Sequence, residues 1–97
     1  MEIIARNFRC HQGEIDIIAK DTDGTTVFVE VKYRKNTKNG LPEEAVTYSK
    51  QKKISRVALF YLSYKKLPLT GSFRFDVISI LGDEITWYKN AFNFIHP

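Results

Sequence analysis

The sequence predicts an α/β domain with a mixed β-sheet, and three features of its pattern carry that prediction. The first third alternates apolar and polar residues and is rich in β-branched and aromatic side chains, which is typical of strands. The segment 49–66 instead repeats apolar residues at helical spacing, and two further strand-like segments follow it. We therefore expect three strands, then a helix, then two strands.

Three strands are expected before the helix, at residues 3–9, 14–20 and 25–34. The sequence Asp21-Thr22-Asp23-Gly24 joins the second strand to the third as a tight turn. Residues 36–40 are expected to form a loop after the third strand.

The helical segment is expected to start at Pro42-Glu43-Glu44. A proline in the first turn and acids near the positive end of the helix dipole both favour a start there. The main helix should span about 49–66, and Pro68 and Gly71 end this segment. The residues expected to face the sheet are Gln51, Ile54, Val57, Ala58, Tyr61 and Leu62.

After the helix, strands are expected at 73–81 and 84–89, and residues 90–97 are expected to form a tail. Arg74 and Asp76 are two apart in the first of these strands and therefore share a face. We expect them to form an ion pair that supports the sheet.

The length and composition fit one compact globular domain, residues 1–97, with 43% hydrophobic and 27% charged residues. No apolar run is long enough to cross a bilayer, and the N-terminus lacks the hydrophobic region of a signal peptide. The single cysteine, Cys10, excludes an intrachain disulfide and fits a reducing compartment. We therefore expect a cytoplasmic protein with no membrane partner.

The formal net charge is +4, and basic residues gather in the middle third of the chain. They are Lys32, Arg34, Lys35, Lys38, Lys50, Lys52, Lys53 and Arg56. Such clustering is the electrostatic footprint of a protein that binds a phosphate backbone, although a solvated helix face and loop gives the same pattern.

Acidic residues stand among apolar ones in two neighbouring strands, which is costly unless the acids are paired, ligated or exposed. Glu14 and Asp16 lie on the second strand, and Glu30 and Lys32 lie on the third. Residues two apart on a strand share a face, so each pair points one way.

The length of the turn decides whether the two pairs share one face. A two-residue turn at Asp23-Gly24 would send Glu30 to the face opposite Asp16. A three-residue loop at 22–24 sets Asp16 opposite Glu30 and makes one face hold both pairs. Because glycine is preferred at the left-handed last position of such loops, we expect the three-residue loop. The acidic face should then include Ile18 and Phe28, and the opposite face Ile15, Ile17, Val29 and Val31.

Opposed residues on neighbouring strands have Cβ atoms about 4.5–5.5 Å apart, so two carboxylates there repel unless a cation lies between them. A divalent ion such as Mg²⁺ or Mn²⁺ would relieve this repulsion, with water and a substrate phosphate as further ligands. Lys32 would orient the attacking water or stabilise developing negative charge. An exposed ladder of cross-strand ion pairs is the alternative interpretation.

Asp16 followed by Glu30-Val31-Lys32 resembles the D…(D/E)-x-K signature of restriction-endonuclease-like nucleases. The match to the bacterial YraN-like family is closer and covers nearly the whole chain. The matching segments are Ala5–Cys10, Gly13–Ala19, Val27–Lys32, Pro42–Val46, Arg74–Val77 and Lys89–Phe92. That family is similar in fold and motif to archaeal-type Holliday-junction resolvases. The resemblance therefore implies a restriction-endonuclease-like fold.

The resemblance also implies roles for individual residues. Asp16 and Glu30 would be metal ligands, with the Val31 carbonyl as a third. Lys32 would be the catalytic lysine. Gln51 would reach the site from the helix.

One departure from the family pattern concerns the N-terminal helix, which members usually carry ahead of the segment that resembles residues 2–10. That helix holds a glutamate of the metal site, and here the chain begins at the strand. Without it, we expect the Ile18 and Phe28 side of the sheet to be uncovered. A partner chain would then cover that side, Glu14 would replace the acid, or activity would be impaired.

The function expected from these features is that of a magnesium- or manganese-dependent endonuclease, acting on DNA more readily than on RNA. Branched DNA is the candidate substrate, and a homodimer would present two sites to it. The catalytic set is Asp16, Glu30, Lys32, Glu14 and Gln51. Phosphate contacts are expected from Arg34, Lys35, Lys38, Lys50, Lys53 and Arg56.

Two alternatives stay open: a nucleic-acid-binding module that has lost hydrolysis, and a structural or interaction protein. Among the aromatic residues, Tyr33 and Tyr48 beside the basic loop are the two expected to touch a base, and most others are expected in the core. His11 is expected to be structural or exposed, because the sequence offers no partner at metal-ligand spacing.

Overall fold

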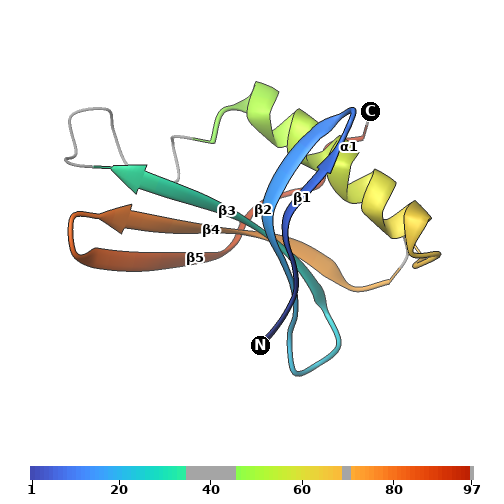
Figure 1. Ribbon diagram of the computed structural model, residues 1–97, viewed down its shortest axis with the longest axis horizontal. Coiled ribbons are helices and arrows are strands. Elements are labelled where there is room, and N and C mark those ends of the chain that lie inside the picture. Colours follow the sequence, from blue (N-terminus) through green and yellow to red (C-terminus); the bar gives the residue numbers. More distant parts are fainter. Residues whose placement is uncertain (35–45, 69–70, 97) are drawn as a thin grey trace.

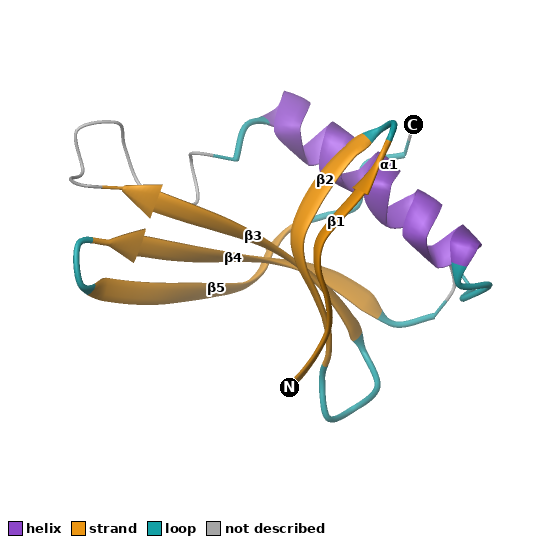
Figure 2. Cartoon of the chain, viewed as in Figure 1, coloured by secondary structure: helices purple, strands orange, loops and turns teal. Residues whose placement is uncertain are grey.

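The computed structural model describes residues 1–34, 46–68 and 71–96. These residues form five strands and one helix in the predicted order (Figures 1 and 2). The bounds are Glu2–Cys10 (β1), Gly13–Lys20 (β2), Thr26–Arg34 (β3), Tyr48–Tyr64 (α1), Phe73–Leu81 (β4) and Glu84–Phe92 (β5). The predicted loop at 36–40 and helix start at Pro42-Glu43-Glu44 fall outside the described residues. No helix in the described ranges combines the length and the apolar character that a membrane crossing needs.

The strands form one sheet in the order β1-β2-β3-β4-β5. β3 and β4 are parallel, whereas the other neighbouring strands are antiparallel. A parallel pair needs a long crossover connection, and the chain between β3 and β4 contains α1. The predicted mixed sheet with a single crossover helix is confirmed for the described residues.

The loop between β2 and β3 has the three-residue form that the sequence predicts. The Asp21 N–H donates to the Thr25 carbonyl at 2.9 Å, which closes the loop around residues 22–24. Gly24 has φ +89°, a left-handed conformation that glycine adopts without strain. The register that follows joins Ile17 to Val29. Continued by one residue past the last paired positions, this register would set Asp16 opposite Glu30.

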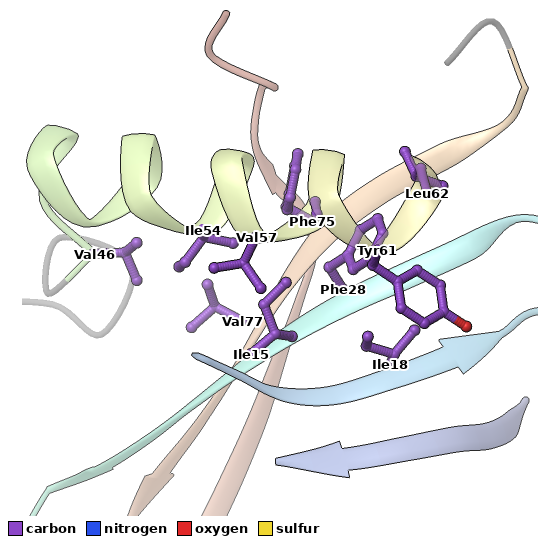
Figure 3. Close-up of a cluster of buried hydrophobic side chains, with 11 residues drawn as sticks. Ile15, Ile18, Phe28, Val46, Ile54, Val57, Tyr61, Leu62, Phe75 and Val77 are labelled. Carbon is purple, nitrogen blue, oxygen red and sulfur yellow. The ribbon is translucent and has the colours of Figure 1, made fainter. Parts of the chain in front are cut away.

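α1 covers one face of the sheet and forms the main core with it (Figure 3). The buried members of this core are Ile15, Ile18, Phe28, Val46, Ile54, Val57, Ala58, Tyr61, Leu62, Phe75 and Val77. The apolar side that the helical periodicity predicts for 49–66 is therefore the side that packs on the sheet.

The prediction for Ile15 is wrong, because Ile15 lies in the core beneath α1 and not with Ile17 on the opposite face. Ile15 and Ile18 are three apart, so regular alternation would put them on opposite faces. On the neighbouring strand, Ala5 and Phe8 pack against the same core with the same spacing. Asn7 lies between them with φ +51°. The β1–β2 hairpin thus turns over near Asn7, and its far end presents Ile15 to the helix.

The expectation of an uncovered Ile18 and Phe28 side is also wrong, since α1 packs there and both side chains are fully buried. The opposite face has a smaller cluster of Ala19, Val27 and Val29. An apolar hollow lies over that face, lined by Met1, Ile3, Ile17, Ala19, Val29, Ile78 and Trp87. The less covered face of the sheet is therefore the face that contains Val29.

α1 begins two residues after Val46, and Thr47 caps its first turn. The Lys50 N–H donates to Thr47 Oγ1 at 3.2 Å, which satisfies one of the free amides of the helix start. After Tyr64, Lys66 adopts φ +57° and ends the helix, close to the predicted end. Thr47 thus fixes where the first turn of α1 stands relative to the sheet.

β5 is longer than predicted, since it continues to Phe92 where the sequence suggests a tail after Lys89. The pairing register of β4 with β5 shifts between Phe75 and Val77, and Asp76 is the β4 residue at this irregularity. Asp76 Oδ1 accepts the Asn90 N–H, and Asp76 Oδ2 accepts Trp87 Nε1–H, both at 2.8 Å. A buried carboxylate on β4 therefore holds the irregular part of β5 in the sheet.

The predicted ion pair of Arg74 with Asp76 is confirmed, with Arg74 Nε 3.0 Å from Asp76 Oδ1. Arg74 Nη1 also donates to Asp21 Oδ2 at 2.9 Å, so the guanidinium links β4 to the β2–β3 turn. Asp76 itself is 0% exposed. Its hydrogen bonds therefore replace all of the water that an exposed carboxylate would bind.

We predict that Asp76→Asn lowers the free energy of unfolding by about 3 kcal/mol, because an amide cannot accept from all these donors and leaves the half-buried Arg74 guanidinium with Asp21 as its remaining carboxylate partner. Urea denaturation followed by Trp87 fluorescence measures the change. Asp83→Asn, in the exposed β4–β5 turn, is the matched control and should change stability by less than about 0.5 kcal/mol. Equal effects of the two variants would contradict this role for Asp76.

Candidate functional site

The β2–β3 pairing ends at Ile17 and Val29, and the two strands separate beyond that point. β2 stays paired with β1 as far as Gly13, whereas β3 stays paired with β4 as far as Arg34. The sheet therefore divides into two arms, with the β1–β2 arm curving toward α1 (Figures 1 and 2). Asp16 and Glu30 are the first residues past the division.

Where the main-chain hydrogen bonds between β2 and β3 stop, a side chain of β2 accepts a hydrogen bond from the main chain of β3. The continued register would join Ile15 to Val31, but the Val31 N–H donates to Asp16 Oδ2 at 2.8 Å. The Asp16 side chain therefore reaches across to β3 at the division. Because the N–H and C=O of one strand residue face the same neighbouring strand, the Val31 carbonyl also faces the side that β2 has left.

A cavity of about 220 Å³ opens at this division. Its lining comes from β2, β3 and α1 and consists of Gly13, Glu14, Asp16, Glu30, Lys50, Lys53 and Ile54. We call it the acidic cleft. The sequence expected a cleft that combines these acids with helix lysines, and the structure brings Asp16, Glu30, Lys50 and Lys53 together in one.

Glu30 is the most buried acid of the acidic cleft, with 7% of its surface exposed. Burial, as the largest cause, and the hydrogen bond and charge of Asp16 together raise its pKa from the ordinary 4.5 to about 7. Lys50 Nζ lies 3.8 Å from Glu30 Oε1 and, with Lys32, opposes the rise. The two carboxyl groups are thus within hydrogen-bonding reach of one another.

Two carboxyl groups so placed can share a proton or can share a cation. A divalent ion with oxygen ligands fits the second case, since Asp16, Glu30 and the Val31 carbonyl all present oxygen toward the division. Within the described ranges, no three His, Cys, Asp or Glu side chains converge on one point. Such a site would leave coordination positions for water and a phosphate, as Mg²⁺ sites commonly do.

The other predicted site residues are placed as follows. Glu14 lines the acidic cleft, but its carboxylate forms an ion pair with Arg9 across the β1–β2 hairpin. Gln51 is half-buried, and its Nε2 donates to the Val46 carbonyl at 3.0 Å, so its amide braces the start of α1. Lys32 follows Glu30 by two residues on β3, and its charge acts on the Glu30 carboxyl. Glu14 and Gln51 therefore have protein partners outside the Asp16–Glu30 pair.

The predicted phosphate contacts divide into those on α1 and those near the end of β3. Lys50 and Lys53 line the acidic cleft, and Arg56 lies one turn further along α1 beside a second cavity. The Arg34 backbone ends β3, whereas Lys35 and Lys38 lie outside the described residues. The helix thus supplies a row of three cations that starts at the acids.

The sequence missed an aromatic groove beside this row, in the second cavity. Its lining is Gln12, Arg56, Leu59, Phe60 and Ser63, and the ring of Tyr64 lies next to that of Phe60. The sequence assigned most helix aromatics to the core, yet Phe60 is 39% and Tyr64 65% exposed. Their exposure could have been predicted from the helical periodicity, because Phe60 and Tyr64 do not lie on the apolar side of the helix that contains Ile54, Ala58 and Tyr61.

Comparison with known proteins places the chain among bacterial relatives. The family model described as "Uncharacterised protein family UPF0102" matches residues 1–80. A UPF0102 protein of Lachnoclostridium phytofermentans is 51% identical over 92 residues, covering 95% of this chain and 77% of the relative. One of Geotalea daltonii is 53% identical over 96 residues, covering 94% and 74%. One of Francisella tularensis subsp. novicida is 49% identical over 96 residues, covering 98% and 81%.

The raised pKa of Glu30 predicts that this residue makes the protein less stable as pH rises. Folding takes up a proton at Glu30 between the ordinary pKa of 4.5 and the folded value of about 7. The resulting stabilisation is complete below the lower value and is lost as pH rises through the upper one. We expect wild type to lose about 3 kcal/mol more stability than Glu30→Gln between pH 5 and pH 8.

Chemical denaturation at the two pH values measures this difference. Glu84→Gln, at an exposed position of β5, is the matched control and should follow wild type at both. A Glu30→Gln profile parallel to wild type would show that Glu30 ionises normally in the folded protein.

Proposed function

The chain belongs to the UPF0102 family, the YraN-like family that its motifs indicate, and we propose that it hydrolyses phosphodiester bonds in nucleic acid with a divalent metal ion. The observation that carries this proposal is the Asp16–Glu30 pair at the division of β2 and β3, with two helix lysines on the opposite wall of the acidic cleft. The mixed five-stranded sheet with one crossover helix is compatible with a restriction-endonuclease-like fold.

The residues that would hold Mg²⁺ or Mn²⁺ are Asp16, Glu30 and, through its carbonyl, Val31. The Val31 N–H fixes the Asp16 carboxylate in position before any ion binds. Glu30 must lose its proton to act as a ligand, so we expect metal affinity to rise between pH 6 and pH 8. The chemistry that a bound ion supplies is neutralisation of phosphate charge and a lowered pKa of water.

The cationic residues in and beside the acidic cleft have two separate roles in this proposal. Lys32, on the strand that carries Glu30, orients the attacking water or stabilises charge that develops on the phosphate. Lys50 and Lys53 hold phosphate groups of the substrate strand beside the acids. The Glu30–Lys50 ion pair shows that α1 already places a cation at the carboxylate.

A second candidate function is a nucleic-acid-binding module that does not hydrolyse its ligand. Its specific support is the pairing of Glu14 with Arg9, which leaves two acidic side chains facing each other among the described residues of the acidic cleft. Three further predictions are kept: the nucleic acid is DNA rather than RNA, the protein forms a homodimer, and its location is cytoplasmic. The single Cys10 favours the last of these.

We predict that Mn²⁺ raises the thermal unfolding midpoint of wild type and not that of Asp16→Asn or Glu30→Gln. At a hundredfold excess over the dissociation constant, binding to the native state contributes about 2.7 kcal/mol. For a domain of this size, that corresponds to a rise of roughly 10 °C at pH 8. Asp16→Asn keeps an oxygen that can accept the Val31 N–H, so its fold should be retained.

The matched control for this experiment is Asp83→Asn, an exposed acid in the β4–β5 turn, which should respond to Mn²⁺ as wild type does. The absence of any response in wild type, or an equal response in all variants, would refute the metal site.

We also predict that Lys32→Ala lowers kcat for cleavage of labelled single-stranded or branched DNA by about a hundredfold, the usual effect of removing one stabilising donor. Its Mn²⁺ response in thermal unfolding should be retained, because Lys32 is not a ligand. Lys20→Ala, an exposed lysine of β2, is the control and should cleave at the wild-type rate. Salt-sensitive binding with no cleavage in either metal, unchanged in Asp16→Ala, would select the binding module instead.

A further inference from the structure

The aromatic groove is lined by residues of the β1–β2 turn and of the C-terminal half of α1. Its volume is about 490 Å³, and its walls include Gln12 from the turn and Arg56, Phe60 and Ser63 from the helix. Gln12 is followed by Gly13, which lines the acidic cleft. Two consecutive residues at the β1–β2 turn therefore line the groove and the acidic cleft.

Aromatic rings in and beside the groove are turned to solvent. The Phe60 and Tyr64 rings are nearly parallel, with an interplanar angle of 11° and centroids 6.4 Å apart. The His11 ring meets Phe60 edge-on at 6.0 Å. An aromatic side chain exposed to water is less favourable than a buried one, so a ligand that covers the ring gains free energy. Two such rings side by side form a platform on which a flat ligand can stack.

The charges around this platform suit an anionic ligand. Arg56 lines the groove, and Lys65 Nζ lies 5.5 Å from the centre of the Tyr64 ring. None of the described lining residues is acidic. A flat ligand that stacks on Phe60 would thus meet a guanidinium at the same time, which is the combination that a nucleotide requires.

The groove and the acidic cleft are lined by neighbouring residues of α1. Lys50, Lys53 and Arg56 follow one another at intervals of three residues along α1, so they form one row on the helix surface. Lys53 faces the acids and Arg56 faces the groove. From Lys53 to Phe60 the helix rises roughly 10 Å, a short span for a nucleic-acid strand.

We propose that the aromatic groove binds an unpaired nucleotide of the same strand whose phosphate lies in the acidic cleft. The base stacks on Phe60 and Tyr64, the amide of Gln12 and the hydroxyl of Ser63 meet its polar edge, and Arg56 binds the adjoining phosphate. This inference rests on the proposed function and specifies its substrate class. Bases of an intact duplex are stacked inside it, so the substrate is single-stranded or has unpaired bases beside the cleaved bond.

A short single-stranded DNA oligonucleotide that carries 2-aminopurine tests the proposal, with EDTA present to prevent cleavage. Stacking of this fluorescent base on an aromatic ring quenches its emission. We expect Phe60→Leu and Tyr64→Leu each to weaken binding about tenfold and to lose the quenching. Arg56→Gln should instead reduce the dependence of binding on salt and keep the quenching.

The matched control is Ile85→Ala, which removes an apolar side chain that is 71% exposed on β5 and lines neither cavity. It should bind and quench as wild type does. Because Phe60 also contacts Phe8, its variant can disturb the hairpin. Tyr64 is the more exposed residue, so Tyr64→Leu tests the platform without that contact, and thermal unfolding verifies the fold of both variants.

The outcomes separate this inference from the proposed function. Unchanged binding and quenching in both groove variants, an equal loss in Ile85→Ala, or no binding of the strand by wild type would each overturn the nucleotide groove. The Mn²⁺ response that Asp16→Asn abolishes would still stand in all three cases. Conversely, loss of binding in Phe60→Leu and Tyr64→Leu, with no Mn²⁺ response in wild type, would support the groove and refute the metal site.

Discussion

The hydrogen bond from the Val31 N–H to Asp16 Oδ2 is the contact on which the described site depends. A strand that leaves its neighbour exposes main-chain groups, and an unsatisfied buried N–H costs about 1–3 kcal/mol. Asp16 removes that cost with its own side chain, so β2 can depart toward α1 while β3 continues along β4. The same contact orients the carboxylate at the division, where the acidic cleft opens. Here the local chemistry that ends a pair of strands also positions an acid.

The division of the sheet explains why the helix lysines reach the acids. Beyond it, the β1–β2 hairpin turns over near Asn7 and packs Ile15 beneath α1. The core contact between β2 and α1 therefore sits directly beside the acidic cleft. Ile54 follows Lys53 on α1, packs in this core and also lines the cleft. The position of the two lysines thus follows from apolar packing and not from attraction to the acids.

Glu30 illustrates how stability and the proposed chemistry oppose each other. Its burial and the nearby Asp16 carboxyl favour the protonated acid, so Glu30 contributes most to stability where it is neutral. A divalent cation would favour the ionised form instead, because it removes the repulsion between the two carboxylates. Asp76 is a buried acid of a different kind, since Arg74, Trp87 and Asn90 supply donors for it within the protein. The contrast lies in the neighbours: donors of the protein surround Asp76, whereas Glu30 faces the second carboxyl group of Asp16.

The sequence by itself determined the order of the elements, the turn and the pairing of the acids. Alternation and helical periodicity are local properties, and Gly24 at the left-handed position selects the three-residue loop that sets the register. The Arg74–Asp76 ion pair followed from the same two-residue spacing. Each of these features depends on residues that are near one another in the chain, or on a single turn.

Only the tertiary structure decided which face each arm presents and which residues share a cavity. Ile15 and the last residues of β5 were assigned wrongly because Asn7 and Asn90 adopt left-handed conformations that interrupt regular alternation, and alternation alone does not reveal them. Likewise, Phe60 and Tyr64 are ordinary helix aromatics in the sequence. The β1–β2 turn, almost fifty residues earlier, makes them the side of a groove. Contacts over such separations depend on how far a hairpin twists, and that twist results from packing across the whole sheet.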